Sequence, residues 1–199
     1  MISREKAIEL LNSFEQKESD MNHYLESEAI MRGLAEHFNS LPSSSEQVDA
    51  DYWGMLGLLH DVDWALTREN PSEHLSKTPE ILKEAGFDEE FIGIVLSHGY
   101  GHEILPQWKN KQREKKVEHA LAAAETMTGI IYAYALMRGK RISDMEVKGL
   151  KKKFKDKAFA QNCNREIIRE IEKTGLELSE FFQISIDALK NIKGEIGLE

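Results

Sequence analysis

Apolar residues recur three and four positions apart along most of the chain, which is the spacing of one face of an α-helix. One such face carries His23, Ser27, Ile30, Leu34 and Phe38. No run of alternating apolar and polar residues between hairpin turns occurs in the sequence, so the pattern gives no strand signal. The hydrophobic pattern therefore predicts an all-α protein.

Capping residues and glycines predict where these helices begin and end. Because the chain has no internal repeat and no long linker rich in Pro, Gly and Ser, we expect one domain over residues 1–199. The segments 39–47 and 99–107 are predicted loops. The predicted helices run from Ser3 to about Phe14, from Asp20 to about Phe38, from Ser45 to near Asp61, from Thr78 to Gly86, from Asp88 to Gly99, from about Arg113 to Arg138, from the capping box at 143–146 onward, from Asn164 to Gly175 and from Ser179 onward.

Composition and charge narrow the class of protein. An apolar fraction of 41% in 199 residues is typical of a globular domain, and no window approaches 18 uninterrupted apolar residues. The single cysteine, Cys163, allows neither an internal disulfide nor a zinc–thiolate cluster. The first residues are amphipathic but acidic, unlike a signal or transit peptide. We therefore expect a cytoplasmic protein that does not bind membranes, of unknown oligomeric state, and a net charge of −9 makes a nucleic-acid polymer an unlikely partner.

Residues 57–64, GLLHDVDW, raise the first functional question. An apolar helical run ends there in His60 and Asp61, and Asp63 follows two residues later. A histidine at a helix C-terminus is also favoured by the helix dipole, so the pair alone leaves open a metal site and an ordinary helix end. Both residues could reach one ion if the helix ends at this point.

Other candidate ligands occur in an order that favours the metal site. His23 lies one turn inside its helix, while His74 and His98 lie near predicted helix ends. Imidazole nitrogens and carboxylate oxygens from distant parts of the chain are the usual ligands of divalent cations. Glu125 is an isolated acid in the apolar stretch ALAAAETMTGII, and a buried carboxylate there would need a partner such as a cation. The alternative is that Glu125 faces solvent.

Several stretches together resemble one family: NHYLESEAIMRGLA around His23, GLLHDVDW, HLSKTPEIL from His74, VLSHGY with His98, AAAETMTGIIYAYAL around Glu125, and KGLKKKFKDKAFAQNCNREII. Over nearly its whole length the chain resembles the HD superfamily of metal-dependent phosphohydrolases, specifically a bacterial HDIG-type hydrolase. The resemblance implies a single-domain helical bundle with a metal-site core at about residues 18–140 and C-terminal helices at 143–199 packed on it.

The resemblance also implies a ligand set for one or two divalent metal ions. His23, His60, Asp61 and Glu125 match the ligands of the first ion, and Asp61 would bridge to a second ion held by His74 and His98. Mn, Fe, Ni, Co, Zn and Mg all remain possible. The sequence departs from the family pattern in two places, since Glu125 replaces the usual Asp and Thr78 replaces a usual Gly.

The implied activity is hydrolysis of a phosphate ester, a nucleotide or another small phosphorylated compound, by metal-activated water. Asp63 is the candidate for orienting or deprotonating that water, and His98 would serve as general acid in a one-metal site. Residues 148–157 hold six lysines, and we expect Lys153, Lys157 and Arg165 to bind the substrate phosphate. The alternative for these cations is a solvated basic helix face.

Two other functions remain open at this stage. The ligand set also resembles that of the di-iron oxygenases built on the same fold. The third possibility is a non-catalytic helical domain that binds a metal or a nucleotide. His37 and His119 are interpreted as ordinary surface or core residues.

Overall fold

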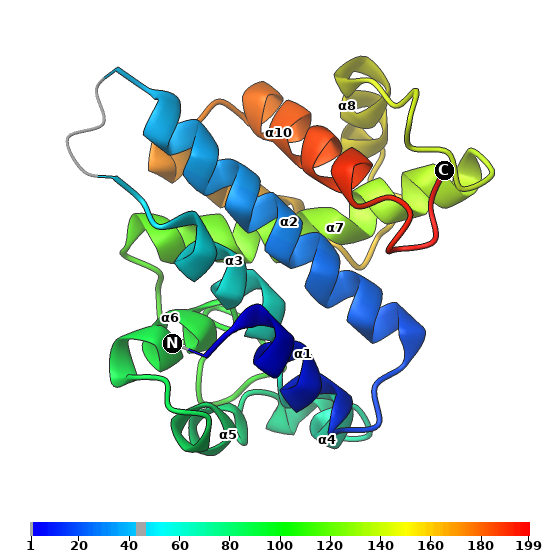
Figure 1. The fold of residues 1–199 in the computed structure, drawn as a ribbon. Coiled ribbons are helices and arrows are strands. Elements are labelled where there is room, and N and C mark those ends of the chain that lie inside the picture. Colours follow the sequence, from blue (N-terminus) through cyan, green and yellow to red (C-terminus); the bar gives the residue numbers. More distant parts are fainter. Residues whose placement is uncertain (1, 43–46) are drawn as a thin grey trace.

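Two long helices, α2 (Glu18–Ser40) and α7 (Lys116–Met137), form the centre of the computed structural model. The structure describes residues 2–42 and 47–199, and every regular element within these ranges is a helix, which confirms the all-α prediction. In Figure 1, α2 crosses α7, with α3 and α10 packed against α2. The other elements are α1 (Arg4–Asn12), α3 (Ala50–Leu59), α4 (Trp64–Thr67), η1 (Pro71–Glu73), α5 (Thr78–Glu84), α6 (Glu89–Ser97), α8 (Val147–Lys155), α9 (Arg165–Arg169), η2 (Glu170–Thr174) and α10 (Leu178–Asn191).

The helix α7 supplies much of the core. By length and composition it is the one described helix that could cross a membrane. In this fold, however, it packs against α2, α3, α6, α8, α9 and α10, and residues 120–124 on it are buried. Its apolar sequence is therefore accounted for by its central position. The C-terminal helices belong to the same packed unit, because α10 contacts α2, α7 and α8.

Several predicted helix boundaries are confirmed by the structure. Ser3, Asp88 and Asn164 are N-caps whose side chains accept hydrogen bonds from backbone N–H groups of the first helical turn. Gly86 and Gly175 follow helices with φ of 88° and 87°, a left-handed conformation that glycine adopts without strain.

Other boundaries differ by one to four residues. Asp20 is not the cap of α2: the helix begins earlier, and the Asp20 carboxylate reaches back to accept from the N–H of Lys17 at 3.1 Å. Thr78 is the first residue of α5 rather than its cap. The predicted cap Ser45 lies outside the described residues, and Asp49 caps α3.

The predicted capping box at residues 143–146 is wrong. The helix α8 begins at Val147 with Glu146 at the N-cap position. The Ser143 N–H instead donates to the carbonyl of Glu199 at 3.1 Å, because the C-terminal residues return to the turn after α7. The last helix likewise begins one residue before Ser179, the predicted cap, which lies inside α10.

Candidate metal centre

Two helix ends position histidines at the same place in the fold. The helix α3 ends at Leu59 and α6 ends at Ser97, so that His60 and His98 are their C-cap residues. Close packing helps to bring α3 onto α2: a Cβ added at Gly57 would lie 2.5 Å from the backbone oxygen of Ser27. Any larger side chain at that position would push α3, and with it His60, away from α2.

The Asp61 carboxylate lies at the centre of four imidazoles. The Nε2 atoms of His74 and His98 both lie 3.1 Å from Asp61 Oδ1. His60 Nε2 lies 3.5 Å from the same oxygen, and His23 Nε2 lies 3.8 Å from Oδ2. These atoms form two groups of three donors, each with all its ligand atoms within 4.8 Å of one another, and Asp61 belongs to both groups.

The second nitrogen of each C-cap histidine fixes its tautomer. His60 Nδ1 lies 2.8 Å from the carbonyl oxygen of Gly57, and His98 Nδ1 lies 2.7 Å from that of Val95. A carbonyl oxygen only accepts, so both Nδ1 atoms carry the proton. In the neutral imidazoles, the Nε2 atoms therefore present lone pairs toward Asp61.

The other two histidines are held in the same tautomer by side chains. His74 Nδ1 lies 3.0 Å from the Asp63 carboxylate, which accepts. His23 Nδ1 lies 2.9 Å from the Thr128 hydroxyl, and that hydroxyl already donates its proton to the carbonyl of Glu125 at 2.6 Å. His23 must therefore donate to Thr128, and its Nε2 is also an acceptor.

The donor set fits divalent cations. The Nε2 atoms of His23 and His60 are 3.0 Å apart and those of His74 and His98 are 3.3 Å apart, although neither atom of a neutral pair has a proton to share. Ligands at about 2.1 Å from one ion are about 3.0 Å apart at neighbouring octahedral positions and about 3.4 Å apart at tetrahedral ones. The observed separations match these values, and a cation would satisfy the lone pairs that the neutral His23 and His60 turn toward one another.

Burial and neighbouring charges set the protonation states of these groups. Burial lowers the pKa of His60 to about 3, so that its imidazole is neutral. Burial opposes ionisation of Asp61, but the surrounding histidines hold its pKa well below the usual value. Burial also lowers the pKa of His74, yet the carboxylates of Asp61 and Asp63 outweigh it and raise that pKa to about 10. Without an ion, a proton on His74 therefore balances part of the carboxylate charge.

Glu125, the predicted sixth ligand, belongs to neither three-donor group. It lies on α7, where its carboxylate contacts the Thr126 hydroxyl, and burial raises its pKa to about 7. Its predicted role as a ligand stays a prediction. Glu125 lines a small hollow together with His23 and Thr128.

The structure gives Asp63 a role other than the predicted one. Its side chain is fully buried, and its two oxygens accept from His74 Nδ1 and from the backbone N–H groups of Leu75, Lys77 and Thr78, at 3.0–3.3 Å. No oxygen of Asp63 is left to orient or deprotonate a water. Asp63 instead positions the His74 ring and the loop that follows it, in which Leu75 has a φ of 68°.

A second positioning group, Arg113, was not identified from the sequence. Its guanidinium donates to three carbonyls at the end of α6, those of Ser97, His98 and Tyr100, at 2.8–3.2 Å. The same guanidinium makes two 2.9 Å hydrogen bonds to the Glu170 carboxylate. His119, which we interpreted as ordinary, also contacts Glu170, at 2.7 Å. Only the three-dimensional structure shows this network, because Glu170 is 57 residues from Arg113.

The three predicted phosphate-binding cations have different surroundings. Arg165 donates to five backbone carbonyls in the segment 154–163, so its guanidinium holds that segment and is not free for a substrate. Lys153 lies over the ring of Phe159, 4.8 Å from the centroid. Lys157 is exposed and lines a hollow between α8 and α9.

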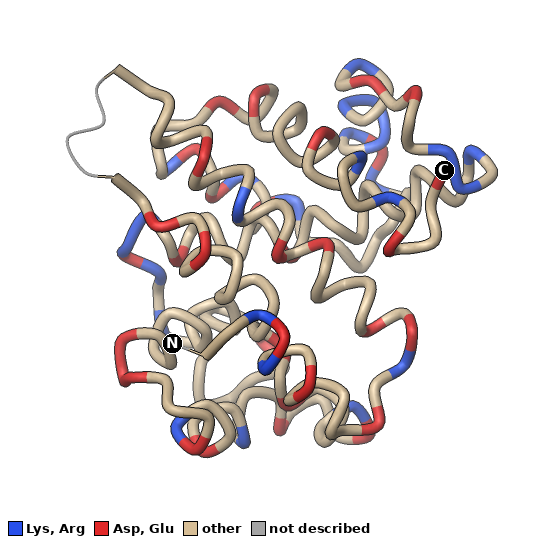
Figure 2. The backbone as a smooth tube through the Cα atoms, in the orientation of Figure 1, with Lys and Arg blue, Asp and Glu red and all other residues tan. Residues whose placement is uncertain are grey.

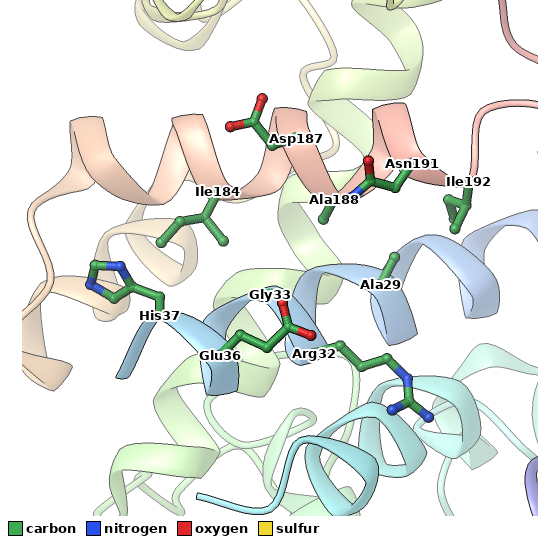
Figure 3. A pocket seen from close by; sticks show the side chains of 10 residues that line it. All are labelled: Ala29, Arg32, Gly33, Glu36, His37, Ile184, Asp187, Ala188, Asn191 and Ile192. Atoms are coloured by element: carbon green, nitrogen blue, oxygen red, sulfur yellow. The ribbon is translucent and has the colours of Figure 1, made fainter. Parts of the chain in front are cut away.

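A further groove, of about 400 Å³, lies between α2 and α10 (Figure 3). It is lined by Arg32 and His37, among others, and by none of the predicted site residues. Arg32 is engaged with Glu28 at 3.1 Å, and His37 lies 3.7 Å from Glu180. We therefore place the functional site at the histidine cluster and not in this groove.

The fold and the donor set define a class, an all-helical domain with a His/Asp centre suited to divalent cations. The family model of the HD domain matches residues 21–131, more than half of the chain, and the chain belongs to this family. The matched range includes every residue of the two donor groups. No match was found among curated proteins or among solved structures. HD domains define a superfamily of metal-dependent phosphohydrolases, which agrees with the expected class of the protein.

Proposed function

We propose that this protein is a metal-dependent hydrolase of a small phosphorylated compound. The observation that carries the proposal is the pair of three-donor groups that share Asp61. Four imidazoles and one carboxylate, with each remaining imidazole nitrogen held by its own acceptor, form a preorganised site for one or two cations. A divalent cation bound there would polarise a phosphoryl oxygen and lower the pKa of a water molecule.

The exposure of the histidines indicates the side from which a substrate would reach the metal centre. His60 and His98 are buried in the protein, whereas the side chain of His23 is 29% exposed and borders the hollow that Glu125 also lines. A substrate would therefore approach from the side of His23 and Glu125. In the hollow, the imidazole of His102 is kept neutral, since burial lowers its pKa to about 4, so it can serve as a hydrogen-bond partner of the substrate.

Metal analysis of purified protein tests the proposal. We expect wild type to bind one or two equivalents of a divalent metal, and His60→Ala and Asp61→Ala to lose most of it. His37→Ala, in the groove between α2 and α10, is the control and should bind as much metal as wild type. If both ligand variants retain the wild-type metal content, the proposed centre is wrong.

The metal-loaded proteins are then assayed on a panel of phosphomonoesters and phosphodiesters. We expect phosphate release by wild type and by His37→Ala, and a loss of at least about 1,000-fold in Asp61→Ala, in keeping with the several kcal/mol that metal assistance supplies. Two ions sharing Asp61 would also suit a di-iron centre. Iron-loaded protein that consumes dioxygen but hydrolyses no ester would replace the proposed function by an oxygenase.

A further inference from the structure

Two hollows meet beside the metal centre. The inner one, of about 220 Å³, is lined by His23 and Glu125 and by residues 162–164. The outer one, of about 630 Å³, lies between α8 and α9 and is lined by the same three residues from its own side. The segment 162–164 is therefore a partition between the inner hollow, beside the metal centre, and the outer hollow.

The size of the inner hollow limits what it can hold. Pockets that bury a small organic ligand have volumes of about 300–1,000 Å³. The inner hollow is below this range, whereas the outer one lies within it. The inner hollow has room for a phosphate group at the ligand cluster and for only a few further atoms of an ester. The rest of such a molecule can reach the outer hollow by passing over residues 162–164, which line both hollows.

The partition at residues 162–164 is held in place from both sides. The five carbonyls that accept from the Arg165 guanidinium include those of Ala160 and Cys163, at 2.6 and 2.7 Å. On the inner side, Cys163 packs against α7 so closely that a Cβ at Gly129 would lie 2.7 Å from its sulfur. The partition is thus part of the folded structure, and the outer hollow has a defined place relative to the candidate metal ligands.

The charge of the outer hollow differs from that of the whole chain. Its lining includes Lys155, Lys157 and Arg169, against one acid, Glu166, among the described lining residues. The chain as a whole has a net charge of −9. Figure 2 shows this contrast: Lys and Arg gather on α8, while Asp and Glu are spread over the rest of the backbone.

We infer that the outer hollow is an anion-binding subsite, and that the substrate is a phosphate ester with a second anionic group at its far end. One anionic group would lie at the ligand cluster and the other at Lys155, Lys157 and Arg169. This inference rests on the proposed function for the inner group. It assigns the specificity of the site to cations that are not near the reacting phosphate.

Binding of non-hydrolysable probes tests the inference without any turnover. Straight-chain alkane bisphosphonates of graded length are compared by calorimetry with alkyl monophosphonates of the same length, on Mg²⁺-loaded protein. We expect the best bisphosphonate to bind wild type about tenfold more tightly than its monophosphonate, because partly exposed ion pairs contribute modestly to affinity.

Matched variants locate the effect. The double variant Lys155→Ala/Lys157→Ala should lose the preference for the bisphosphonate and bind the monophosphonate as wild type does. Lys148→Ala/Lys151→Ala removes the same charge from α8, on residues that do not line the hollow, and should keep the preference. Glu166→Gln removes the acid of the hollow and should strengthen the preference.

Three results would overturn the inference. In the first, wild type binds both probes with equal affinity. In the second, the two lysine double variants lose the preference for the bisphosphonate equally. In the third, Lys155→Ala/Lys157→Ala loses affinity for both probes to the same extent. The second result would mean that α8 is only a basic helix face. Failure of the proposed function is a separate result: metal-loaded wild type would then hydrolyse no ester, whereas the preference for the bisphosphonate could still be measured.

Discussion

The two walls of the metal centre are held in different ways. On one wall, His60 and His98 are C-cap residues whose side chains are 0% and 7% exposed, and each donates to a carbonyl three residues earlier in its own helix. On the other wall, His23 is 29% exposed and its ring is held by the hydroxyl of Thr128 on α7. Glu125 follows on the same helix, outside both donor groups.

The difference separates ligand geometry from access. Backbone carbonyls at a helix end cannot rotate, so the wall of His60 and His98 fixes the positions of its nitrogens. The wall of His23 and Glu125 borders the inner hollow, and it is the side from which a substrate would come. We call the wall of His60 and His98 the buried wall and the wall of His23 and Glu125 the open wall. If this comparison is right, changes behind the buried wall should affect metal binding and folding strongly, and changes behind the open wall should affect them weakly.

The largest effect is expected from Asp63→Ala, which removes the support of His74, a 12% exposed neighbour of His98 on the same wall. Four donors would lose their acceptor, two of them buried and two partly buried. Because each loss at a buried donor costs about 1–3 kcal/mol, the free energy of unfolding should fall by more than about 3 kcal/mol. Loss of an outer partner of a metal-binding histidine typically lowers metal affinity about 10–100-fold. Thermal unfolding and metal titration measure the two effects.

The control for this variant is Asp49→Ala. Asp49 also accepts from two backbone N–H groups, but at the exposed start of α3 and away from the cluster. It should lose about 1 kcal/mol of stability, the usual contribution of an N-cap, and no metal affinity. Equal effects of the two variants would mean that Asp63 is an ordinary cap and that the buried wall needs no support from it.

A smaller effect is expected from Arg113→Met, which acts on the same wall through α6. The change leaves three carbonyls at the end of α6 without their donor and leaves Glu170 with His119 as its nearest partner. Breaking a buried ion pair costs about 3–5 kcal/mol, and because Glu170 is 19% exposed we expect about 2–3 kcal/mol in chemical denaturation.

Hydrogen exchange shows whether the effect of Arg113→Met is local. The amides at the end of α6 should exchange faster, because the helix end that carries His98 is no longer held. Arg138→Met is the control, since Arg138 pairs with the exposed Asp144 at the C-terminal end of α7 and should change stability by less than about 1 kcal/mol. Unchanged exchange at α6 in Arg113→Met would contradict a positioning role for this residue.

The parts of the site that were predicted from the sequence are those with a local signal. His60 and Asp61 end an apolar helical run, and the resemblance to the HD superfamily pointed to His23, His74 and His98, all of which the structure brings together. The stops at Gly86 and Gly175 likewise depend on neighbouring residues alone. Such features are visible in a sequence because the physical cause and its effect lie within a few residues of each other.

The parts that were not predicted depend on contacts between distant segments. An acid such as Asp63 has the same appearance in a sequence whether it meets water or the backbone N–H groups of a loop that begins eleven residues later, at His74. Arg165 resembles a phosphate ligand until the carbonyls of the segment 154–163 are seen around it. Arg113 and Glu170 come into contact only when α6, α7 and η2 are packed together.

The smallest effect is expected behind the open wall, from Thr128→Val. Valine keeps the shape of threonine but accepts no hydrogen bond, so His23 loses the partner that holds the proton on Nδ1. A larger share of the ring would then carry its proton on Nε2, the nitrogen that faces Asp61, and could not bind an ion there. Because His23 is partly exposed and water can replace the hydroxyl, we expect metal affinity to fall by less than about tenfold, the lower end of the range for such partners.

Thr126→Val provides the matched control for this prediction. Its hydroxyl donates to the carbonyl of Ala122 within α7 and contacts Glu125, but it does not touch His23. Nitrogen NMR of the metal-free proteins should show a shift toward the Nε2-protonated tautomer of His23 in Thr128→Val and none in Thr126→Val. If Thr128→Val instead weakened metal binding as much as Asp63→Ala, the open wall would fix ligand geometry as strictly as the buried one. The division between a rigid wall and an accessible wall would then have to be abandoned.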